Sequence, residues 1–318
     1  MDATPLFMNW SREGERQGSF GIIRTGVVKP GALTAELLDV QDSGEASWVR
    51  EGHWSLGKVI GRGATGTVHM GMIKDTGRLI AVKVIEMHHH ARSGASGSEH
   101  AHHHHREVQM MRLLRHPNLV AFLGSTSRGN ELFILQEWVP GGSLLALLSS
   151  FGRLNTKVVR HYARQVLHGL AYLHANTIAH RDLKCANLLV DAGGNVKIAD
   201  FGTSAVVSQC RGNHGQLIGT PIYMAPELLF QGKHGLPVDI WAFGAAVLEM
   251  ATALAPWRIQ GPEGMPSIDY LRCLVAKEHA PALPLDLDAA LRSMLMQCFC
   301  WRSGDRPTCS ALLAHDFL

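Results

Sequence analysis

HRDLKCANLLV at residues 180–190 and ADFG at residues 199–202 decide the fold of this chain. Both stretches are predicted to lie in loops, because the first follows a long helical pattern and the second follows the short apolar run of residues 196–198. In the helical pattern, apolar side chains step by three or four residues, at Val159, Tyr162, Val166, Leu170 and Leu173. Charged and amide side chains at fixed spacings between apolar elements make these two stretches far more specific than the other motifs.

The rest of the chain divides into a smaller strand-rich part and a larger helix-rich part. Strand patterns separated by turns follow Trp54 and occupy residues 58–61, 67–73, 78–86, 119–125 and 131–138. Helical patterns dominate from Pro226 onward, and the two parts join near residues 137–142. The expected fold class is therefore α+β, with a ligand cleft at the junction of the two parts.

Composition and charge exclude several classes of protein. The 318 residues carry a formal charge of only +3, without the clustered basic face that is typical of nucleic-acid binding. The longest apolar run, residues 240–255, is too short for a membrane span and contains Glu249, so we expect a helix buried in a core. The first residues lack the basic and apolar regions of a secretory signal. The six cysteines form no CxxC pair, so we expect reduced thiols and a cytoplasmic or nuclear protein.

Two segments show little regular pattern. Residues 1–52 are rich in glycine and are expected to form a flexible tail, although Leu33, Leu37 and Val40 have the spacing of a short docking helix. Residues 88–105 contain eight histidines. We expect a flexible polar insert there, and the alternative is a site for zinc, copper or nickel, which imidazole suits.

A glycine-rich stretch and a lysine in the strand-rich part indicate phosphate binding. IGRGATGTV at residues 60–68 contains G-x-G-x-x-G-x-V, whose glycines allow backbone amides to approach phosphate oxygens. A strand pattern follows instead of a helix, which disfavours a dinucleotide-binding turn and leaves a plain glycine hairpin as the alternative. Lys83 lies within an apolar strand, where a buried ammonium needs a carboxylate partner. Glu107 is the candidate partner, and a solvated lysine at a strand edge is the alternative.

Further motifs complete a recognisable set. GTPIYMAPE at residues 219–227, DIWAFG at residues 239–244 and the pair Arg306-Pro307 follow in order. Together with the preceding motifs, they resemble a eukaryotic protein kinase domain over residues 54–318. The resemblance implies a bilobal α+β fold over residues 53–318, with an N-lobe at 53–136, a hinge at 137–142 and a C-lobe at 143–318.

The resemblance also implies which residues form the site. The catalytic residues would be Asp182, Lys184, Lys83, Glu107 and Thr220. Asp182 would orient the acceptor hydroxyl, and Lys184 would neutralise charge on the γ-phosphate. Asn187 and Asp200 would hold Mg²⁺, which prefers oxygen ligands. ATP would contact Ile60, Gly61, Arg62, Gly63, Ala64, Thr65, Gly66, Thr67, Val68, Ala81, Lys83, Gln136, Glu137, Val139 and Leu189.

The resemblance to protein kinases implies structural roles for other residues of these motifs. Glu227 and Arg306 are expected to form a buried ion pair. His180 and Phe201 are expected to pack in the core. None of these four side chains is assigned to the chemistry.

Finer features resemble one branch of that family. Lys184 within HRDLKxxN and the GTP before YMAPE are typical of serine/threonine kinases, and strings such as HPNLVAFLG and EWVPGGSLLALL resemble mitogen-activated protein (MAP) kinase kinase kinases of the STE group. The implied partners are ATP and protein substrates, in particular MAP kinase kinases, with no nucleic acid and no membrane insertion. The alternatives are a kinase-fold scaffold with weak catalysis and an STE-like kinase outside these cascades.

One departure from the family pattern concerns activation. Four residues before the threonine of Gly-Thr-Pro, where a phosphorylated Ser or Thr would pair with Arg181, this chain has Gln216. A phosphate on Thr203, Ser204 or Ser208 could replace that contact. A neutral hydrogen bond from Gln216 is the other route.

The cysteines leave two alternatives open. Cys185 is expected to be a buried packing residue, and the alternative is a redox-sensitive thiol beside the catalytic loop. Cys298, Cys300 and Cys309 are expected in the core. A zinc site is the alternative, but no fourth ligand follows at regular spacing.

Overall fold

The computed structural model describes residues 52–63, 66–87, 108–207, 219–232, 234–257 and 268–318. The tail at residues 1–51, the histidine-rich insert with Glu107, and the segment 208–218 with Gln216 lie outside the described residues. The sequence predictions that concern these segments remain predictions.

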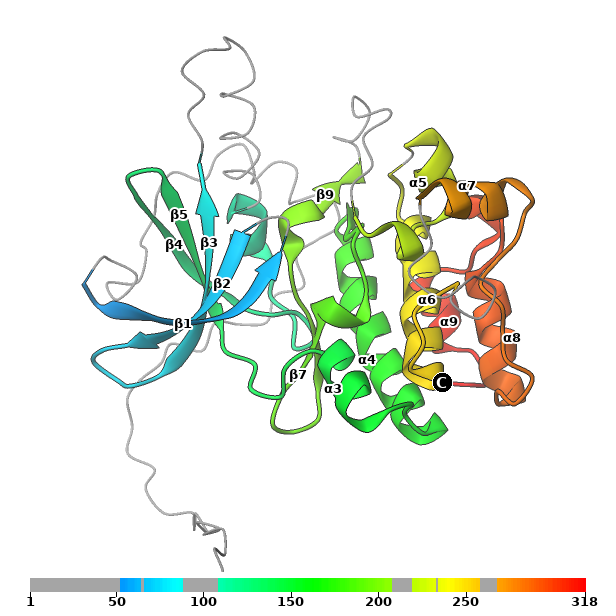
Figure 1. The fold of residues 1–318 in the computed structure, drawn as a ribbon, viewed down its shortest axis with the longest axis horizontal. Coiled ribbons are helices and arrows are strands. Elements are labelled where there is room, and N and C mark those ends of the chain that lie inside the picture. The colour runs from blue at the N-terminus through cyan, green and yellow to red at the C-terminus, as the bar shows by residue number, and fades with distance from the viewer. Residues whose placement is uncertain (1–51, 64–65, 88–107, 208–218, 233, 258–267) are drawn as a thin grey trace, which may run out of the picture.

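A five-stranded antiparallel sheet forms the N-terminal part (Figure 1). Its strands are β1 (Trp54–Gly63), β2 (Gly66–Ile73), β3 (Leu79–Glu86), β4 (Phe122–Arg128) and β5 (Glu131–Glu137), in the order β1-β2-β3-β5-β4. Each of the five strand patterns in the sequence corresponds to one of these strands. β4 begins at Phe122 and not at residue 119, because Leu119 bridges Ile198 and the Val120 amide donates to the Ile198 carbonyl. Pairing with a distant strand thus removes the first residues of that pattern from the sheet.

The two faces of this sheet bury different apolar clusters, since strand side chains alternate between faces. One face forms a small cluster that consists of Trp54, Ile73, Ile80, Val82, Phe133 and Leu135. The other face contributes Ile85 and Ile134 to the main core, which also contains Val108 and Met111 of the helical residues 108–113. Lys83 follows Val82 on β3 and precedes Ile85 by two residues, so its side chain lies on the same face of the sheet as Ile85, toward the main core.

Helices build most of the C-terminal part. They are α3 (Leu144–Phe151), α4 (Thr156–Ala175), α5 (Pro226–Gln231), α6 (Pro237–Thr252), α7 (Ile268–Ala276), α8 (Ala289–Cys298) and α9 (Cys309–Leu313). Two small antiparallel pairs, β6 (Ile178–Ala179) with β9 (Ala205–Val206) and β7 (Leu188–Val190) with β8 (Val196–Ile198), lie between the sheet and these helices. Short 3₁₀ turns occur at Cys185–Asn187, Phe201–Thr203, Pro221–Tyr223 and Ser303–Asp305.

Helix α4 is the long amphipathic helix that the sequence predicts. The Asn155 side chain caps it by accepting the Val158 amide, which satisfies one of the free N–H groups of the first turn. Its apolar stripe, from Val159 to Leu173, is buried against α6 and β8. The loop with Asp182 therefore begins from a rigid element.

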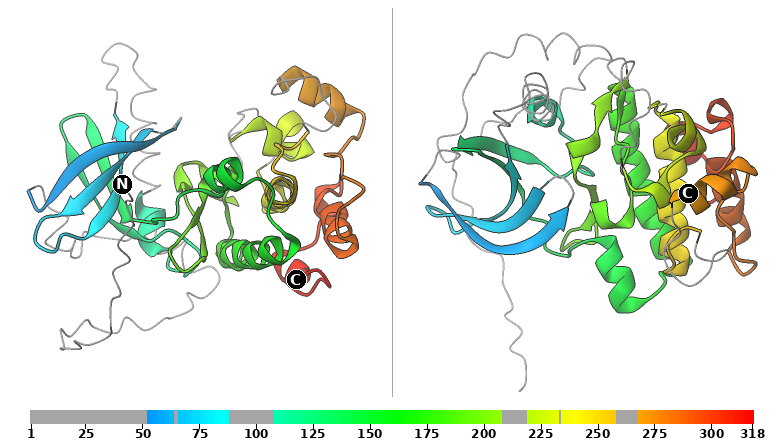
Figure 2. Two further views of the ribbon diagram at one scale, coloured as in Figure 1. Left: turned by 60° about the horizontal axis from the view of Figure 1, so that its bottom comes forward. Right: turned by 45° about the horizontal axis from the view of Figure 1, so that its top comes forward.

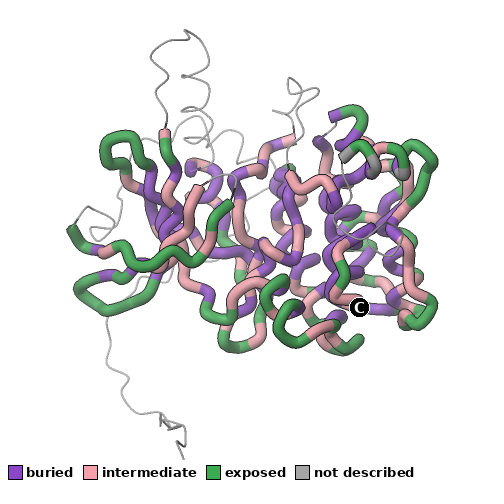
Figure 3. Tube along the Cα trace, in the orientation of Figure 1, coloured by how far each residue is buried: buried purple, intermediate pink, exposed green. Residues whose placement is uncertain are grey.

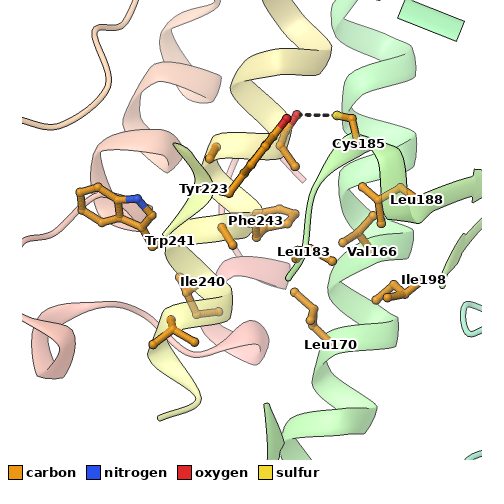
Figure 4. Close-up of a cluster of buried hydrophobic side chains, with 14 of the residues drawn as sticks. Val166, Leu170, Leu183, Cys185, Leu188, Ile198, Tyr223, Ile240, Trp241 and Phe243 are labelled. Atoms are coloured by element: carbon orange, nitrogen blue, oxygen red, sulfur yellow. Dashed lines mark hydrogen bonds between the residues drawn. The ribbon is translucent and has the colours of Figure 1, made fainter. Parts of the chain in front are cut away.

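Helix α6 lies at the centre of the helical part. Residues 238–250 are all buried, and Figure 4 shows Phe243 and Ile240 facing Val166 and Leu170 of α4. The prediction of a helix buried in a core is confirmed, and within the described ranges no helix is long and apolar enough to cross a membrane. The Glu249 carboxyl accepts the Tyr223 hydroxyl at 2.6 Å, and burial raises the pKa of Glu249.

The sheet and the helices α6 to α9 lie at opposite ends of the molecule, with α3, α4 and the small strand pairs between them (Figures 1 and 2). Buried backbone runs through the interior of both parts, while the turns between strands are exposed (Figure 3). Residues 138–143 connect β5 to α3. The expected α+β fold with two parts is confirmed.

Candidate active site

A buried carboxylate holds the loop that follows β6. Asp239, at the start of α6, is completely buried, and its carboxylate accepts the backbone N–H groups of His180 and Arg181, both at 2.8 Å. Arg181 has a φ of 68°, which residues with a Cβ rarely adopt. Two charge-assisted hydrogen bonds therefore stabilise a strained turn, and Asp182 follows directly after it.

His174, in the last turn of α4, is a further partner of Asp239. Its Nε2 lies 2.9 Å from Asp239 Oδ2, and its Nδ1 lies 3.5 Å from the Cys309 sulfur. Burial lowers the pKa of His174, but the contacts with Asp239 and Cys309 outweigh burial and raise the pKa to about 10. Burial raises the pKa of Asp239, yet the contact with His174 outweighs it, so the pKa of Asp239 is lowered.

Sequence reasoning missed the roles of both residues. A carboxylate directly before the longest apolar run was a usable signal for Asp239, because a buried charge requires partners. No local signal existed for His174, since its partners lie 65 and 135 residues further along the chain.

The raised pKa of His174 predicts a loss of stability at alkaline pH. The folded-state pKa of about 10 lies above the ordinary value of 6.5. The stabilisation of the folded state by protonated His174 is therefore complete below pH 6.5 and declines as the pH rises to about 10. His174→Gln can still donate to Asp239 but does not titrate, so the free energy of unfolding should depend less on pH between 7 and 10. Urea unfolding at several pH values measures this. The exposed His161→Gln on the same helix is the control, and equal slopes for wild type and His174→Gln would contradict the prediction.

Three predicted site residues meet beside this loop. The Lys184 ammonium lies 2.7 Å from Asp182 Oδ2 and 2.7 Å from the Thr220 oxygen, and the Thr220 hydroxyl donates to Asp182 Oδ1 at 2.7 Å. Gly219 has a φ of 111°, and a Cβ there would lie 2.5 Å from the Arg181 carbonyl oxygen. Only glycine therefore allows the chain before Thr220 to approach the loop so closely.

Asn187 also contacts the carboxylate of Asp182. Its Nδ2 donates to the Asp182 carbonyl at 2.8 Å and to Asp182 Oδ2 at 3.2 Å. Because both bonds use the amide nitrogen, the amide oxygen of Asn187 remains as an acceptor for another group.

Lys83 and Asp200 form an ion pair across 117 residues of sequence. The ammonium lies 2.8 Å from Asp200 Oδ1, and the Lys83 side chain is buried. Burial raises the pKa of Asp200, but the positive charge of Lys83 outweighs burial and lowers the pKa below its ordinary value. The alternative of a solvated lysine is therefore wrong. The predicted contact with Glu107 lies outside the described residues and stays a prediction.

The residues predicted to contact ATP lie on β1, β2, β3 and β5, in the segment after β5, and on β7. The turn between β1 and β2 pairs Gly61 with Val68, Arg62 with Thr67 and Gly63 with Gly66. Gly66 has a φ of 138°, and a Cβ there would lie 2.4 Å from the Val84 carbonyl oxygen, so this position requires glycine. Ala81 pairs with Gln136 across β3 and β5. Ile60 is exposed on β1, while Ala64 and Thr65 lie outside the described residues.

The end of β5 joins the two parts of the molecule. The Glu137 carboxylate accepts the Ala121 amide at 2.8 Å and lies 2.9 Å from the Lys197 ammonium on β8. Val139 is buried, and Leu189 on β7 is partly buried and forms a bridge with Ser143. The candidate adenine residues therefore belong to a segment that is anchored on both sides.

The structure contains the ion pair expected between Glu227 and Arg306. The guanidinium contacts both carboxylate oxygens, at 2.6 and 2.7 Å, and its side chain has no exposed surface. The guanidinium carbon also lies 5.1 Å from the centre of the Trp241 ring. His180 and Phe201 are buried with their ring centres 5.6 Å apart, which is the expected core packing.

The cysteines that the structure describes are packing residues or surface residues. Cys185 is completely buried and donates to the Ala246 carbonyl, and burial raises the pKa of its thiol well above the ordinary value. This agrees with the packing interpretation and disfavours a reactive thiol. Cys298 and Cys309 are buried and Cys300 is partly exposed. Among the described residues, no three His, Cys, Asp or Glu side chains are placed to hold a metal ion.

Comparison with known proteins agrees with this geometry. The family described as "protein kinase domain" matches residues 54–318. Mitogen-activated protein kinase kinase kinase ANP1 of Arabidopsis thaliana is 42% identical over 267 residues, which cover 83% of this chain and 40% of that protein. Mitogen-activated protein kinase kinase kinase A of Dictyostelium discoideum is 37% identical over 265 residues, which cover 83% of this chain and 28% of that protein. Mitogen-activated protein kinase kinase kinase 1 of Homo sapiens is 35% identical over 288 residues, which cover 89% of this chain and 19% of that protein. The chain thus spans two fifths or less of the length of these curated relatives.

Proposed function

The chain belongs to the protein kinase family, and from this premise we propose that it transfers the γ-phosphoryl group of ATP to serine or threonine hydroxyls of protein substrates. The observation that carries the proposal is the contact of Asp182, Lys184 and Thr220 within 2.7 Å. Phosphoryl transfer needs positioning and charge neutralisation more than covalent chemistry by the protein. A carboxylate, an ammonium and a hydroxyl in mutual contact can supply both.

The available donor atoms fit magnesium. Asp200 and Asn187 offer a carboxylate and an amide oxygen, and the two hydrogen bonds of the Asn187 nitrogen leave that oxygen free to coordinate. Mg²⁺ takes one or two such protein ligands and completes its shell with phosphate and water. When bound, the ion would neutralise negative charge on the phosphates. Asp200 and Asn187 are the residues that would hold it.

ATP would bind between the sheet and the helical part. The glycine turn from Gly61 to Gly66 would place backbone amides over the phosphates. Lys83, whose ammonium lies 2.8 Å from Asp200, would hold the α- and β-phosphates, with Glu107 fixing it. The backbone of Glu137 and Val139 would bind the adenine edge, with Gln136 at the back of the pocket.

At the acceptor, each residue of the cluster has a distinct role. Asp182 would accept a hydrogen bond from the substrate hydroxyl and orient it toward the phosphate. Lys184 would stabilise negative charge that develops on the transferred group. Thr220, bonded to both, would keep the carboxylate and the ammonium in register.

We further propose that the substrates are MAP kinase kinases. The support is the similarity to MAP kinase kinase kinases from a plant, an amoeba and a mammal. The kinase domain would cover residues 53–318, with its N-lobe, hinge and C-lobe as expected from the sequence, and the protein would act in the cytoplasm or the nucleus.

Transfer of radiolabelled phosphate tests the proposal. Purified protein is incubated with γ-³²P-ATP and a MAP kinase kinase whose own catalytic aspartate is replaced. We expect label on serine or threonine, and EDTA should abolish it because magnesium is then removed. Nucleotide binding without any transfer, to this substrate or to generic protein substrates, would instead indicate a scaffold that has lost catalysis.

Hydrogen exchange tests the adenine position. Nucleotide should slow exchange of the backbone amides within residues 136–140, because the adenine edge bonds there and shields them from water. Residues 246–250 of α6, which are buried far from the sheet, serve as the internal control. Protection elsewhere that leaves residues 136–140 unchanged would contradict the placement.

A further inference from the structure

Thr203, the residue after Gly202, bonds to the loop of Asp182 in both directions. Its hydroxyl donates to the His180 carbonyl at 3.0 Å, and its own carbonyl accepts the Arg181 Nε–H. The Ser204 hydroxyl lies 3.4 Å from the same His180 oxygen, and Ser204 is 9% exposed. Both hydroxyls are therefore directed toward the loop and not toward solvent.

These bonds complete the anchoring of His180. Its N–H is held by Asp239, and its ring contacts the Ala199 carbonyl at 3.1 Å. Its carbonyl is held by Thr203. The peptide two residues before Asp182 is thus bound to the segment that carries Asp200.

A short path links the two acids of the site through this contact. Asp182 lies two residues after His180, and Asp200 lies three residues before Thr203. Asp200 and Arg181 both have a positive φ, a conformation that needs support from neighbouring groups. The bonds of Thr203, together with the contact of the His180 ring with the Ala199 carbonyl, join the segment of Asp200 to the loop of Asp182.

A phosphate on Thr203 would be incompatible with this contact. Phosphorylation replaces the hydroxyl donor by oxygens that only accept and that carry negative charge. Those oxygens would face the His180 carbonyl oxygen, which also only accepts. Thr203 is thus a poor substitute for the phosphorylation site that is missing at position 216, where this chain has Gln216.

We propose that Thr203 is a positioning residue that sets the distance between Asp182 and Asp200, and that it is not a phosphorylation site. The inference rests on the proposed function, because it assigns these two acids to the acceptor and to magnesium. It concerns how the same site is held in its working geometry.

Two substitutions of Thr203 separate its hydroxyl from its shape. Thr203→Val keeps the branched side chain and removes the donor, so kcat should fall about tenfold and half-maximal activity should need more Mg²⁺. The KM for protein substrate should not change. Thr203→Ser restores the donor and should bring kcat to within about twofold of wild type. Thr252→Val is the matched control, since the Thr252 hydroxyl also donates to a carbonyl, that of Leu248, but far from the site.

Thr203→Glu tests the phosphorylation alternative. The carboxylate imitates a phosphate, so the proposal expects activity no higher than that of Thr203→Val. Activity above wild type would overturn the proposal, as would full activity of Thr203→Val. Thermal unfolding of each variant checks that the fold is retained.

A binding measurement distinguishes a failure of the inference from a failure of the proposed function. Calorimetric titration with ATP is performed with Mg²⁺ and with EDTA. Thr203→Val should weaken binding about fivefold with Mg²⁺ and leave binding in EDTA unchanged, because only the metal ligand is displaced. Equal Mg²⁺-dependent binding by Thr203→Val and wild type would overturn the inference. A wild type that binds Mg²⁺ and ATP but transfers no phosphate would instead refute the proposed function.

Discussion

Asp182→Asn is expected to lower kcat by about a thousandfold while nucleotide binding is retained, since a positioned general base contributes roughly 10²–10⁴ to the rate. The amide can still accept the Thr220 hydroxyl, but it can neither take up a proton nor pair with the Lys184 ammonium as a charge. Steady-state transfer to a protein substrate gives kcat, and calorimetry gives the Kd for ATP.

The matched control for this variant is Asp286→Asn. Asp286 is an exposed carboxylate that pairs with Arg153 on the surface, so its loss should leave kcat unchanged. Undiminished transfer by Asp182→Asn would refute the role of Asp182. A parallel loss of ATP affinity would show that the substitution has disturbed the nucleotide site as well.

Arg306→Met is expected to cost about 3–5 kcal/mol of unfolding free energy, the range for breaking a buried ion pair. The substitution leaves the Glu227 carboxylate in a buried position without its guanidinium. It also removes donors from the Cys300 and Pro237 carbonyls. For a domain of this size, the melting temperature should fall by roughly 10 °C.

Arg153→Met provides the same chemical change in an exposed pair. Both partners of that pair, Arg153 and Asp286, are more than 60% exposed, so the expected cost is about 0–1 kcal/mol. The double variant Glu227→Gln with Arg306→Met should cost less than the sum of the two single variants, because it leaves no unpaired charge. A loss below about 1 kcal/mol for Arg306→Met would contradict the assignment of this pair to stability.

The local pattern of the sequence was sufficient for the main elements, while the list of site residues came from the motif resemblance and stays a prediction. The strands β1 to β5 and the helix α4 follow from alternation and from the 3.6-residue period, which are local properties. The helix α6 follows from an apolar run too short to span a membrane. Glu227 and Arg306 were paired correctly because the motif resemblance already contained that contact.

Only the tertiary structure decided which groups meet. The sequence can indicate that Asp239 is buried but not what it contacts, and its bonds to the His180 and Arg181 amides exist because α6 places it next to the loop. The same holds for the contact of Lys83 with Asp200, for the pairing that shortens β4, and for the direction of the Thr203 hydroxyl. Periodicity reports which face of an element is buried, because that depends on neighbours in the chain. The partner of a buried polar group depends on burial and on segments 20 to 120 residues away, which no local pattern encodes.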